Sequence, residues 1–266
     1  MRVYIMTDLE GVSGVLEFDD RQSTHPVAQK TRTFHRRLLT GEVNAAVAGA
    51  CDAGATYVLV NDAHGGGNTI LFDQLDPRAE IVQGRERGRW FPHLDGSSDC
   101  VFKVGAHAMA GTPRAVLCHT YSRKVRHWKL NGTPIGEFGV MALVAGYYGV
   151  PTVLCTGDLA ATKEAQALIP EIVVASVKEG LSRFAAKQLS HPRACELIRE
   201  RAAEAVRRLP EIPPPTVEGP YTFRIELFEN SFDPERPPSG GTVIDPTTVE
   251  YTEDDLLAAF SHFHPV

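Results

Sequence analysis

The N-terminal stretch reads Met6-Thr7-Asp8-Leu9-Glu10-Gly11-Val12-Ser13-Gly14 and directly follows the apolar run Val3-Tyr4-Ile5, which predicts a buried strand. In an extended segment residues i and i+2 point to the same side, so Asp8 and Glu10 can converge on one point. Two convergent carboxylates beside a core repel each other unless a positive charge lies between them. A divalent metal ion is the simplest such charge. The alternative is that both are ordinary polar residues of a loop.

Further apolar runs of strand length alternate with segments of helical periodicity. Residues from about 26 to 53 place apolar side chains three or four apart, which predicts a helix. Such alternation predicts an α/β fold with a mostly parallel sheet flanked by helices. Ligands of these sheets bind at the carboxyl ends of the strands. Side chains able to do chemistry directly follow the predicted strands, namely Asp8, His64, His107, His119 (after a predicted strand at 115–118) and Asp158.

The C-terminal part has a different pattern. From about residue 182 to 209 the sequence is helical and rich in charge, and a proline run follows it. Two predicted strands and a closing helix come after, at 223–228, 243–245 and 254–263. The interpretation is an α/β metal-binding catalytic domain over residues 1–190 and a smaller C-terminal α+β region over residues 191–266.

The composition is that of a globular protein long enough to bury a sizeable core. Of 266 residues 43% are hydrophobic, and the formal net charge of −6 comes without a basic stripe. We therefore expect no nucleic acid as a partner, and no membrane, since no apolar run approaches the roughly 20 residues of a span. The five cysteines include no Cys-x-x-Cys pair and indicate free thiols. With no signal peptide visible, a cytoplasmic protein is expected.

Candidate metal ligands lie on separate predicted elements, as a convergent site requires. They are Asp8, Glu10, His64, His107 and Glu137, with His119 nearby. Each also has an ordinary interpretation: His64 as a turn residue, His107 as a hydrogen-bonded core histidine, and Glu137 as an acid favoured by the helix dipole. The glycine triplet at 65–67 lacks the Lys-Ser/Thr of a phosphate-binding P-loop, which favours a flexible loop.

The order and spacing of these motifs are similar to those of a known family. The matching segments include Asp8-Leu9-Glu10-Gly11-Val12-Ser13-Gly14, Val58-Leu59-Val60-Asn61-Asp62-Ala63-His64, Gly105-Ala106-His107-Ala108, Gly136-Glu137-Phe138-Gly139 and Gly146-Tyr147-Tyr148-Gly149-Val150-Pro151. The sequence resembles the D-aminopeptidase family of dinuclear zinc metallopeptidases, the DppA type. The resemblance covers about residues 1–190 well and the remainder more loosely.

The resemblance implies a role for each matching residue. Asp8 matches the family aspartate that bridges two zinc ions, His119 matches its catalytic histidine, and the other metal ligands match Glu10, His64, His107 and Glu137. The implied activity is that of a zinc-dependent aminopeptidase. It would hydrolyse short peptides from a free N-terminus, D-alanyl peptides such as D-Ala-D-Ala among them, through a water activated by two zinc ions. Manganese or cobalt could use the same ligands. The resemblance also implies a homo-oligomer, a decameric ring.

The roles of three further side chains stay open at this point. His119 is not needed to complete the ligand set, so it could pass a proton to the leaving amine or hydrogen-bond the tetrahedral oxyanion. Asp62 and Asp158 could orient ligand histidines, or they could be structural turn residues.

Two other functions fit parts of the sequence. Asp8-Leu9-Glu10-Gly11 superficially resembles the Asp-x-Asp-Gly of magnesium-dependent phosphatases with an aspartyl nucleophile, but Glu10 replaces the second aspartate. Asp158 also lacks the closely following acid that such a magnesium site needs. The non-catalytic alternative is a metal-stabilised ring scaffold, against which the full set of ligands and His119 argues.

Overall fold

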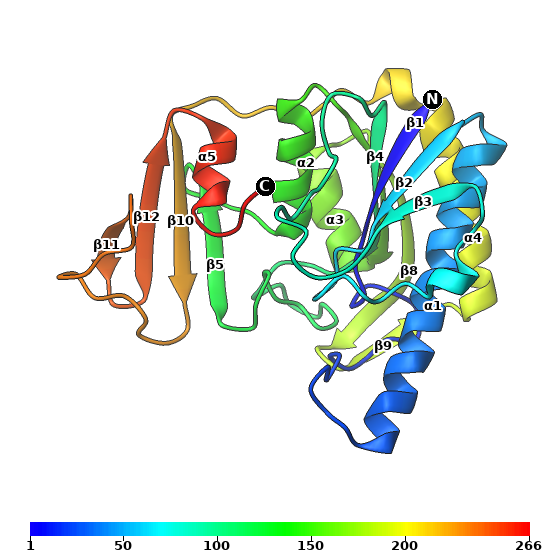
Figure 1. Cartoon of the computed structure of the whole chain (residues 1–266), viewed down its shortest axis with the longest axis horizontal. Coiled ribbons are helices and arrows are strands. Elements are labelled where there is room, and N and C mark those ends of the chain that lie inside the picture. The colour runs from blue at the N-terminus through cyan, green and yellow to red at the C-terminus, as the bar shows by residue number, and fades with distance from the viewer.

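A seven-stranded sheet forms the centre of the molecule (Figure 1). The computed structural model describes all residues 1–266. The strand order is β3 (Ala79–Val82), β2 (Tyr57–Asn61), β1 (Arg2–Thr7), β4 (Cys100–Ala106), β7 (Thr152–Asp158), β8 (Val173–Ser182), β9 (Ala185–Gln188). All neighbours pair in parallel except β8 and β9, which form an antiparallel hairpin at one edge. The predicted α/β fold with a mostly parallel sheet is confirmed.

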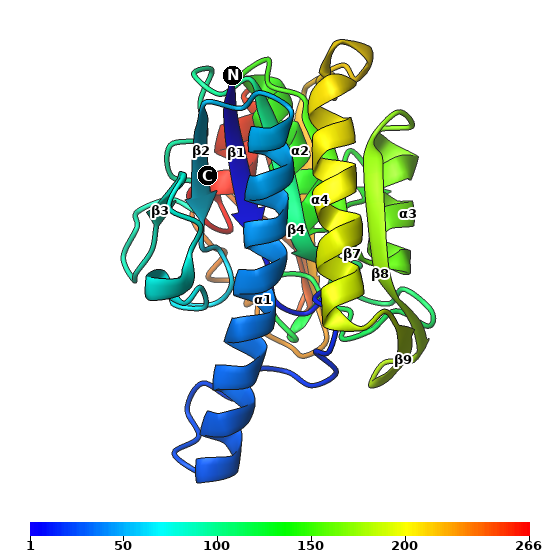
Figure 2. The same cartoon turned by 90° about the vertical axis from the view of Figure 1, so that its right-hand side faces the viewer.

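Helices cover both faces of this sheet. Figure 2 shows α1 (Pro26–Asp52) and α4 (His191–Arg207) side by side on one face, while α2 (Glu137–Tyr147) and α3 (Leu159–Leu168) cover the other. The apolar stripe of α1 packs inward, as its spacing predicts, and α2 is buried from Phe138 to Gly146. Burial of α2 on all sides fixes the position of its first residue, Glu137, at the carboxyl edge of the sheet. No helix combines the length and the apolar composition needed to cross a lipid bilayer.

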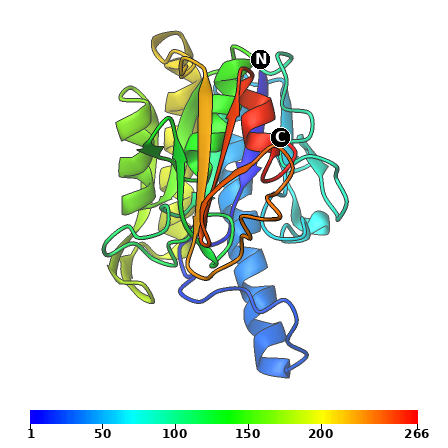
Figure 3. The same cartoon turned by 90° about the vertical axis from the view of Figure 1, so that its left-hand side faces the viewer.

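A second sheet, wholly antiparallel, packs beyond α2 (Figure 3). Its order is β11 (Thr242–Asp245), β12 (Thr248–Glu253), β10 (Tyr221–Leu227), β5 (Val125–Leu130), β6 (Thr133–Pro134), with α5 (Leu256–Ser261) against β10 and β12. Two short 3-10 turns complete the secondary structure, at Phe72–Gln74 and Leu209–Glu211. The division predicted near Ser190 does not follow the division between the sheets, because β5 and β6 precede it. As a domain boundary it stays a prediction.

The predicted strand at 115–118 is wrong. The segment is a buried turn in which Leu117 has a φ of 51°, outside the extended region. Its amides bond to non-adjacent groups: Val116 N donates to Asp158 Oδ2 at 3.0 Å and Leu117 N to Arg183 O at 2.9 Å. The run is apolar because Val116 and Leu117 are fully buried, and burial alone does not distinguish a strand from a core turn.

The helix predicted from about residue 182 begins later, at His191. Residues 185–188, Ala-Ala-Lys-Gln, favour a helix locally but form β9, because they pair with β8 in register from Lys178–Gln188 to Ser182–Ala185. Tertiary pairing overrides local propensity at this sheet edge.

The backbone that follows β1 packs closely on the end of β4. Asp8 N donates to Val104 O and Gly11 N donates to Gly105 O, both at 2.8 Å. Gly105 has a φ of +80°, and a Cβ there would overlap the carbonyl of Asp8. These two contacts set the spacing between the residues that follow the two strands.

Gly105→Ala is therefore expected to destabilise the protein by about 2–4 kcal/mol, because left-handed strain adds to a backbone overlap. Gly132 is a matched control, since it has the same φ of +80° and a Cβ there would meet nothing within 4 Å. Gly132→Ala should cost only the strain, about 1–2 kcal/mol. Urea unfolding of both variants measures the difference, and equal losses would refute the close-approach argument.

Candidate metal centre

The candidate residues gather at the point where the order of strands in the central sheet reverses. From β1 the chain moves outward to β2 and β3, whereas from β4 it moves the other way to β7 and β8 (Figure 1). Such a reversal opens a crevice between the carboxyl ends of two neighbouring strands. Asp8 and Glu10 follow β1, His107 follows β4, and His64 follows the adjacent β2. The strand-end placement predicted for these four residues brings them to one edge.

One cluster consists of Asp8, Glu10 and His64. His64 Nδ1 lies 3.3 Å from Asp8 Oδ1 and 3.1 Å from Glu10 Oε2. All three side chains are almost fully removed from solvent. Asp8 and Glu10 thus converge as predicted, although the backbone bends at Leu9 and turns at Glu10 and does not stay extended.

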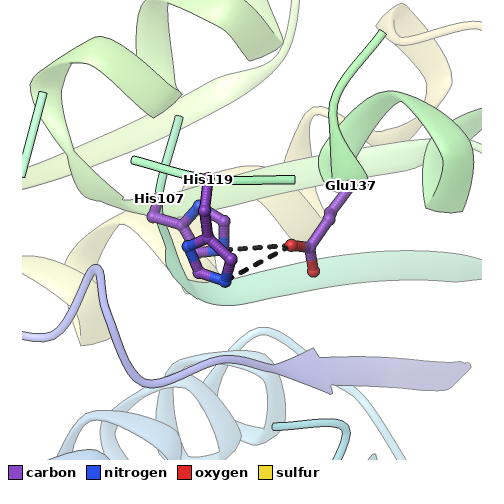
Figure 4. A group of neighbouring side chains, drawn as sticks. All are labelled: His107, His119 and Glu137. Carbon is purple, nitrogen blue, oxygen red and sulfur yellow. Dashed lines mark ion pairs between the residues drawn. The ribbon is translucent and has the colours of Figure 1, made fainter. Parts of the chain in front are cut away.

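The second cluster consists of His107, His119 and Glu137 (Figure 4). Glu137 Oε1 lies 3.2 Å from His107 Nε2 and 3.9 Å from His119 Nε2. The two imidazole rings stack, with centroids 4.0 Å apart and planes within 14°. Tyr121 N donates to the same Oε1 at 2.6 Å and so holds the carboxylate in place.

Asp8 joins the two clusters through its two oxygens. Oδ1 faces His64, while Oδ2 lies 3.4 Å from His107 Nε2 and 3.0 Å from Lys103 Nζ. Burial alone would raise the pKa of Asp8. Lys103, and after it His107 and His64, outweigh burial and hold the pKa well below its usual range. Asp8 is therefore a carboxylate, with one oxygen directed to each cluster.

The donor atoms fit a divalent cation better than they fit one another. Glu10 Oε2 makes no well-aligned hydrogen bond despite its 3.1 Å approach to His64 Nδ1, and His64 Nε2 is buried without any partner. Burial would lower the pKa of His64 and of His107, but the neighbouring carboxylates raise both. They raise the pKa of His107 to about 10. Protonated imidazoles thus supply the positive charge that the carboxylates require. A divalent cation would replace those protons, because a ligating imidazole is neutral.

His119 presents one nitrogen to the cluster and anchors the other. Its Nδ1 lies 2.9 Å from Leu117 O, which can only accept, so the proton is on Nδ1 and Nε2 of the neutral ring carries a lone pair. Burial, and then His107, lower the pKa of His119, which keeps the ring neutral near pH 7. Phe18 packs edge-on against it, with centroids 5.5 Å apart. Nε2 can therefore accept a proton or bind a cation.

Asp62 and Asp158 contact backbone amides and no histidine. Asp62 Oδ2 accepts hydrogen bonds from Thr69 N at 2.6 Å and Ile70 N at 2.9 Å, and Asp158 Oδ2 accepts from Val116 N. These contacts favour the structural interpretation for both. Asp62 orders the loop after His64, and Asp158 orders the turn before His119.

Two lysines of the site were not predicted from the sequence. Lys103 makes the closest contact to Asp8 Oδ2 in the site. The sequence feature that could have revealed it is a lysine within the otherwise apolar residues 101–104 of β4, because a buried charge requires a partner. The second is Lys178 on β8. Its Nζ donates to the carbonyls of Glu10, Val12 and Val15 at 2.5–3.0 Å and so holds the loop that follows Asp8.

Glu42 on α1 supports the same loop through Ser13 N, which donates to its Oε1 at 2.9 Å. Burial raises the pKa of Glu42 from 4.5 to about 8. Between these values the folded protein holds a proton that the unfolded chain releases. The free energy of unfolding should therefore fall as pH rises from about 5 to 8, by on the order of a few kcal/mol.

Glu42→Gln keeps the acceptor for Ser13 and should remove this part of the pH dependence. Glu171→Gln, at an exposed position without an ion pair, is the matched control and should leave it unchanged. Denaturant unfolding at pH 5, 6.5 and 8 measures both. An unchanged slope in Glu42→Gln would show that Glu42 is ionised in the folded state.

Both clusters open into one cavity of about 700 Å³. Its lining includes Asp8, Glu10, His64, His119 and Glu137, and it also includes five arginines, at positions 21, 85, 87, 89 and 123. The chain returns here at its C-terminal end, where Trp90 N donates to Pro265 O at 2.8 Å. The volume suits a small ligand held against the donor clusters.

Two adjoining carboxylate–histidine clusters in an open cavity, at the carboxyl edge of a parallel sheet, are typical of metal-dependent hydrolases. Residues 1–264 match the sequence profile of the D-aminopeptidase family M55, and the chain belongs to this family of peptidases. The family resemblance deduced from the motifs is thereby confirmed. Membership favours peptide hydrolysis over the phosphatase alternative.

Two matches, one by sequence and one by structure, extend over nearly the whole chain. A D-aminopeptidase of Bacillus subtilis (strain 168) is 34% identical over 265 residues, which cover 98% of this chain and 94% of the relative. The solved structure of the Zn-dependent D-aminopeptidase DppA from Bacillus subtilis, described as a self-compartmentalizing protease, superposes with a TM-score of 0.90. That structure is 33% identical, with 98% of this chain and 95% of the other covered.

Proposed function

We propose that this protein is a dinuclear zinc aminopeptidase that removes the N-terminal residue from short peptides, with D-alanyl peptides such as D-Ala-D-Ala as substrates. The arrangement of Asp8 carries the proposal, because its two oxygens face two separate donor clusters. Family membership supports the reaction, and the zinc dependence of the DppA relative supports the metal.

Each residue has a defined part in this proposal. Asp8 would be shared between two metal positions, with Glu10 and His64 at the first and His107 and Glu137 at the second. Two zinc ions, when bound, would lower the pKa of a shared water and polarise the scissile carbonyl. Lys103 Nζ donates a hydrogen bond to Asp8 Oδ2 and so keeps both oxygens oriented toward the clusters.

His119 is the proton-transfer residue in this proposal. Its neutral ring carries the lone pair on Nε2 and the bond to Leu117 O fixes the ring, so Nε2 can accept a proton at the cavity wall. Once protonated, the same nitrogen can donate to the departing amine. His119 also stands in the donor group with His107 and Glu137, so a ligand role is the competing assignment.

The proposal includes an assembly and a location. The DppA relative is described as self-compartmentalizing, and we propose a homo-oligomer, a decameric ring, for this chain as well. All five cysteines are unpaired, as expected in the reducing cytoplasm where we place the protein. Sedimentation velocity of the untagged protein tests the assembly, and a monomer at micromolar concentration would contradict it.

The central experiment measures metal content and dipeptide hydrolysis in the same preparation, purified without a chelator. We expect about two zinc ions per chain and release of D-alanine from D-Ala-D-Ala. Dialysis against a chelator should abolish both, and added zinc should restore both. Two bound ions without hydrolysis of any dipeptide would favour the non-catalytic scaffold, whereas a chain that binds no metal would refute the proposal.

A further inference from the structure

The cavity that the donor clusters line also carries a group of basic side chains. Arg21, Arg85, Arg87, Arg89 and Arg123 line it together with two further acids, Asp19 and Glu86, and none of the five arginines forms an ion pair with a carboxylate. The whole chain carries a net charge of −6, so this local positive charge is against the trend of the molecule. Unpaired guanidinium groups gathered in a concave site attract anionic ligands.

Three of these arginines pack on the glycine triplet that follows His64. A Cβ at Gly65 would overlap the guanidinium of Arg21, and a Cβ at Gly67 would lie 2.7 Å from the Arg87 guanidinium carbon. At the middle glycine, residue 66, the corresponding distance to Arg85 is 3.7 Å. The three glycines thus form the surface on which Arg21, Arg85 and Arg87 pack.

The two outer glycines are fixed by backbone conformation as well as by space. Gly65 and Gly67 have φ values of 55° and 65°, in the region that favours glycine. Arg87 is further anchored, because it donates to Asn61 Oδ1 at 3.0 Å and to the carbonyl of Asp62. The glycine triplet, which predicted only a flexible loop, is therefore a shaped surface beside the candidate ligand His64.

We propose that Arg21, Arg85 and Arg87 form a subsite for the C-terminal carboxylate of a di- or tripeptide. The inference rests on the proposed aminopeptidase function and names the substrate class of that site. A guanidinium binds a carboxylate through two parallel hydrogen bonds. The enzyme would then recognise both ends of its substrate and select peptides by length.

The spacing along the chain agrees with a short peptide. Arg21 packs on Gly65, the residue directly after His64, and Arg85 and Arg87 pack on the next two residues, so the three side chains extend from His64 along the triplet. In a dipeptide the C-terminal carboxylate is one residue from the scissile carbonyl, a span of about 3.3–3.6 Å in an extended chain. A peptide longer than three residues would carry its carboxylate past the triplet and lose the contact.

The test compares D-Ala-D-Ala with its C-terminal amide, which lacks only the negative charge. The wild-type enzyme should cleave the acid with a kcat/KM about 10- to 100-fold higher, mainly through a lower KM, since a hydrogen bond to a charged group is worth that much. Arg21→Gln with Arg85→Gln should bring this ratio to about threefold or less, with the loss confined to the acid. An equal fall in kcat/KM for the acid and for the amide would indicate a structural defect and would overturn the proposal.

A control variant and a third substrate complete the test. Arg126→Gln is the matched control, because Arg126 is exposed on β5, outside the cavity and without an ion pair, and it should keep the wild-type ratio. D-Ala-D-Asp amide carries its only carboxylate on a side chain. If it were cleaved as well as D-Ala-D-Ala, the assignment to the C-terminus would be wrong.

The outcomes separate the two proposals. Equal cleavage of acid and amide by the wild-type enzyme would leave the aminopeptidase function intact and overturn the subsite. Failure to cleave any of the three substrates with zinc bound would overturn both. A high acid-to-amide ratio that collapses only in the double arginine variant would establish the subsite.

Discussion

Asp8→Asn is expected to empty both proposed metal positions and to lower kcat/KM by about 10³-fold or more, since several kcal/mol of transition-state stabilisation is lost with the metals. The reason is geometric. Asp8 directs Oδ1 to the cluster of Glu10 and His64 and Oδ2 to that of His107 and Glu137. An amide retains the shape of the side chain but not its charge, so a shared bridge is lost from both positions together.

Metal analysis of three variants distinguishes this bridge from an ordinary ligand. Glu10→Gln should lower the zinc content to about one ion per chain, Glu137→Gln should do the same at the other position, and Asp8→Asn should bring it close to zero. Asp73→Asn, at an exposed residue outside the cavity, is the matched control and should retain both ions. Retention of one ion by Asp8→Asn would assign Asp8 to a single position.

The same substitution tests the role of Lys103. Its Nζ is buried 3.0 Å from Asp8 Oδ2, and loss of one partner of a buried ion pair costs about 3–5 kcal/mol. Asp8→Asn should therefore also lower the free energy of unfolding, measured by urea titration of the metal-free protein. A fold defect is separated from a metal defect by the far-UV circular dichroism of the variant, which should match that of the wild type.

Much of the site could be predicted because parallel strands align their carboxyl ends. Asp8, His64 and His107 each follow an apolar run, and runs that form neighbouring parallel strands bring such residues to one edge. Glu137 was correctly predicted at the start of a helix, but acids favour that position in any case, so the local pattern alone did not assign it to the site. The strand-end inferences require only the local pattern and the common direction of parallel strands.

The rest depends on contacts between distant segments, which a local pattern does not contain. The second sheet pairs β5 with β10, about 100 residues later in the chain, and nothing in residues 125–130 identifies that partner. The arginines on the glycine triplet come from two loops, where sequence periodicity gives no position. His119 was singled out by a strand prediction that is wrong, because the run before it is a turn fixed by Asp158, and its catalytic role came only from the family resemblance.

His119→Ala is the second variant with a large expected effect, a fall in kcat of about 10²- to 10⁴-fold, the usual contribution of a general acid–base residue. The fall should occur with both metal ions retained, because Asp8, Glu10, His64, His107 and Glu137 are all present. His127→Ala, on β5 and outside the cavity, is the control and should keep the wild-type kcat.

Metal content decides between the two assignments of His119. Its Nε2 is 3.9 Å from Glu137 Oε1 and its ring stacks on His107, so a cation at that cluster could recruit it as a ligand. A ligand role predicts a loss of about one ion per chain in His119→Ala. A proton-transfer role predicts full metal content, partial rescue of kcat by added imidazole, and loss of the pH-dependent limb that a neutral base produces. Because Leu117 O holds Nδ1 and burial keeps the ring neutral by lowering its pKa, we expect the second result.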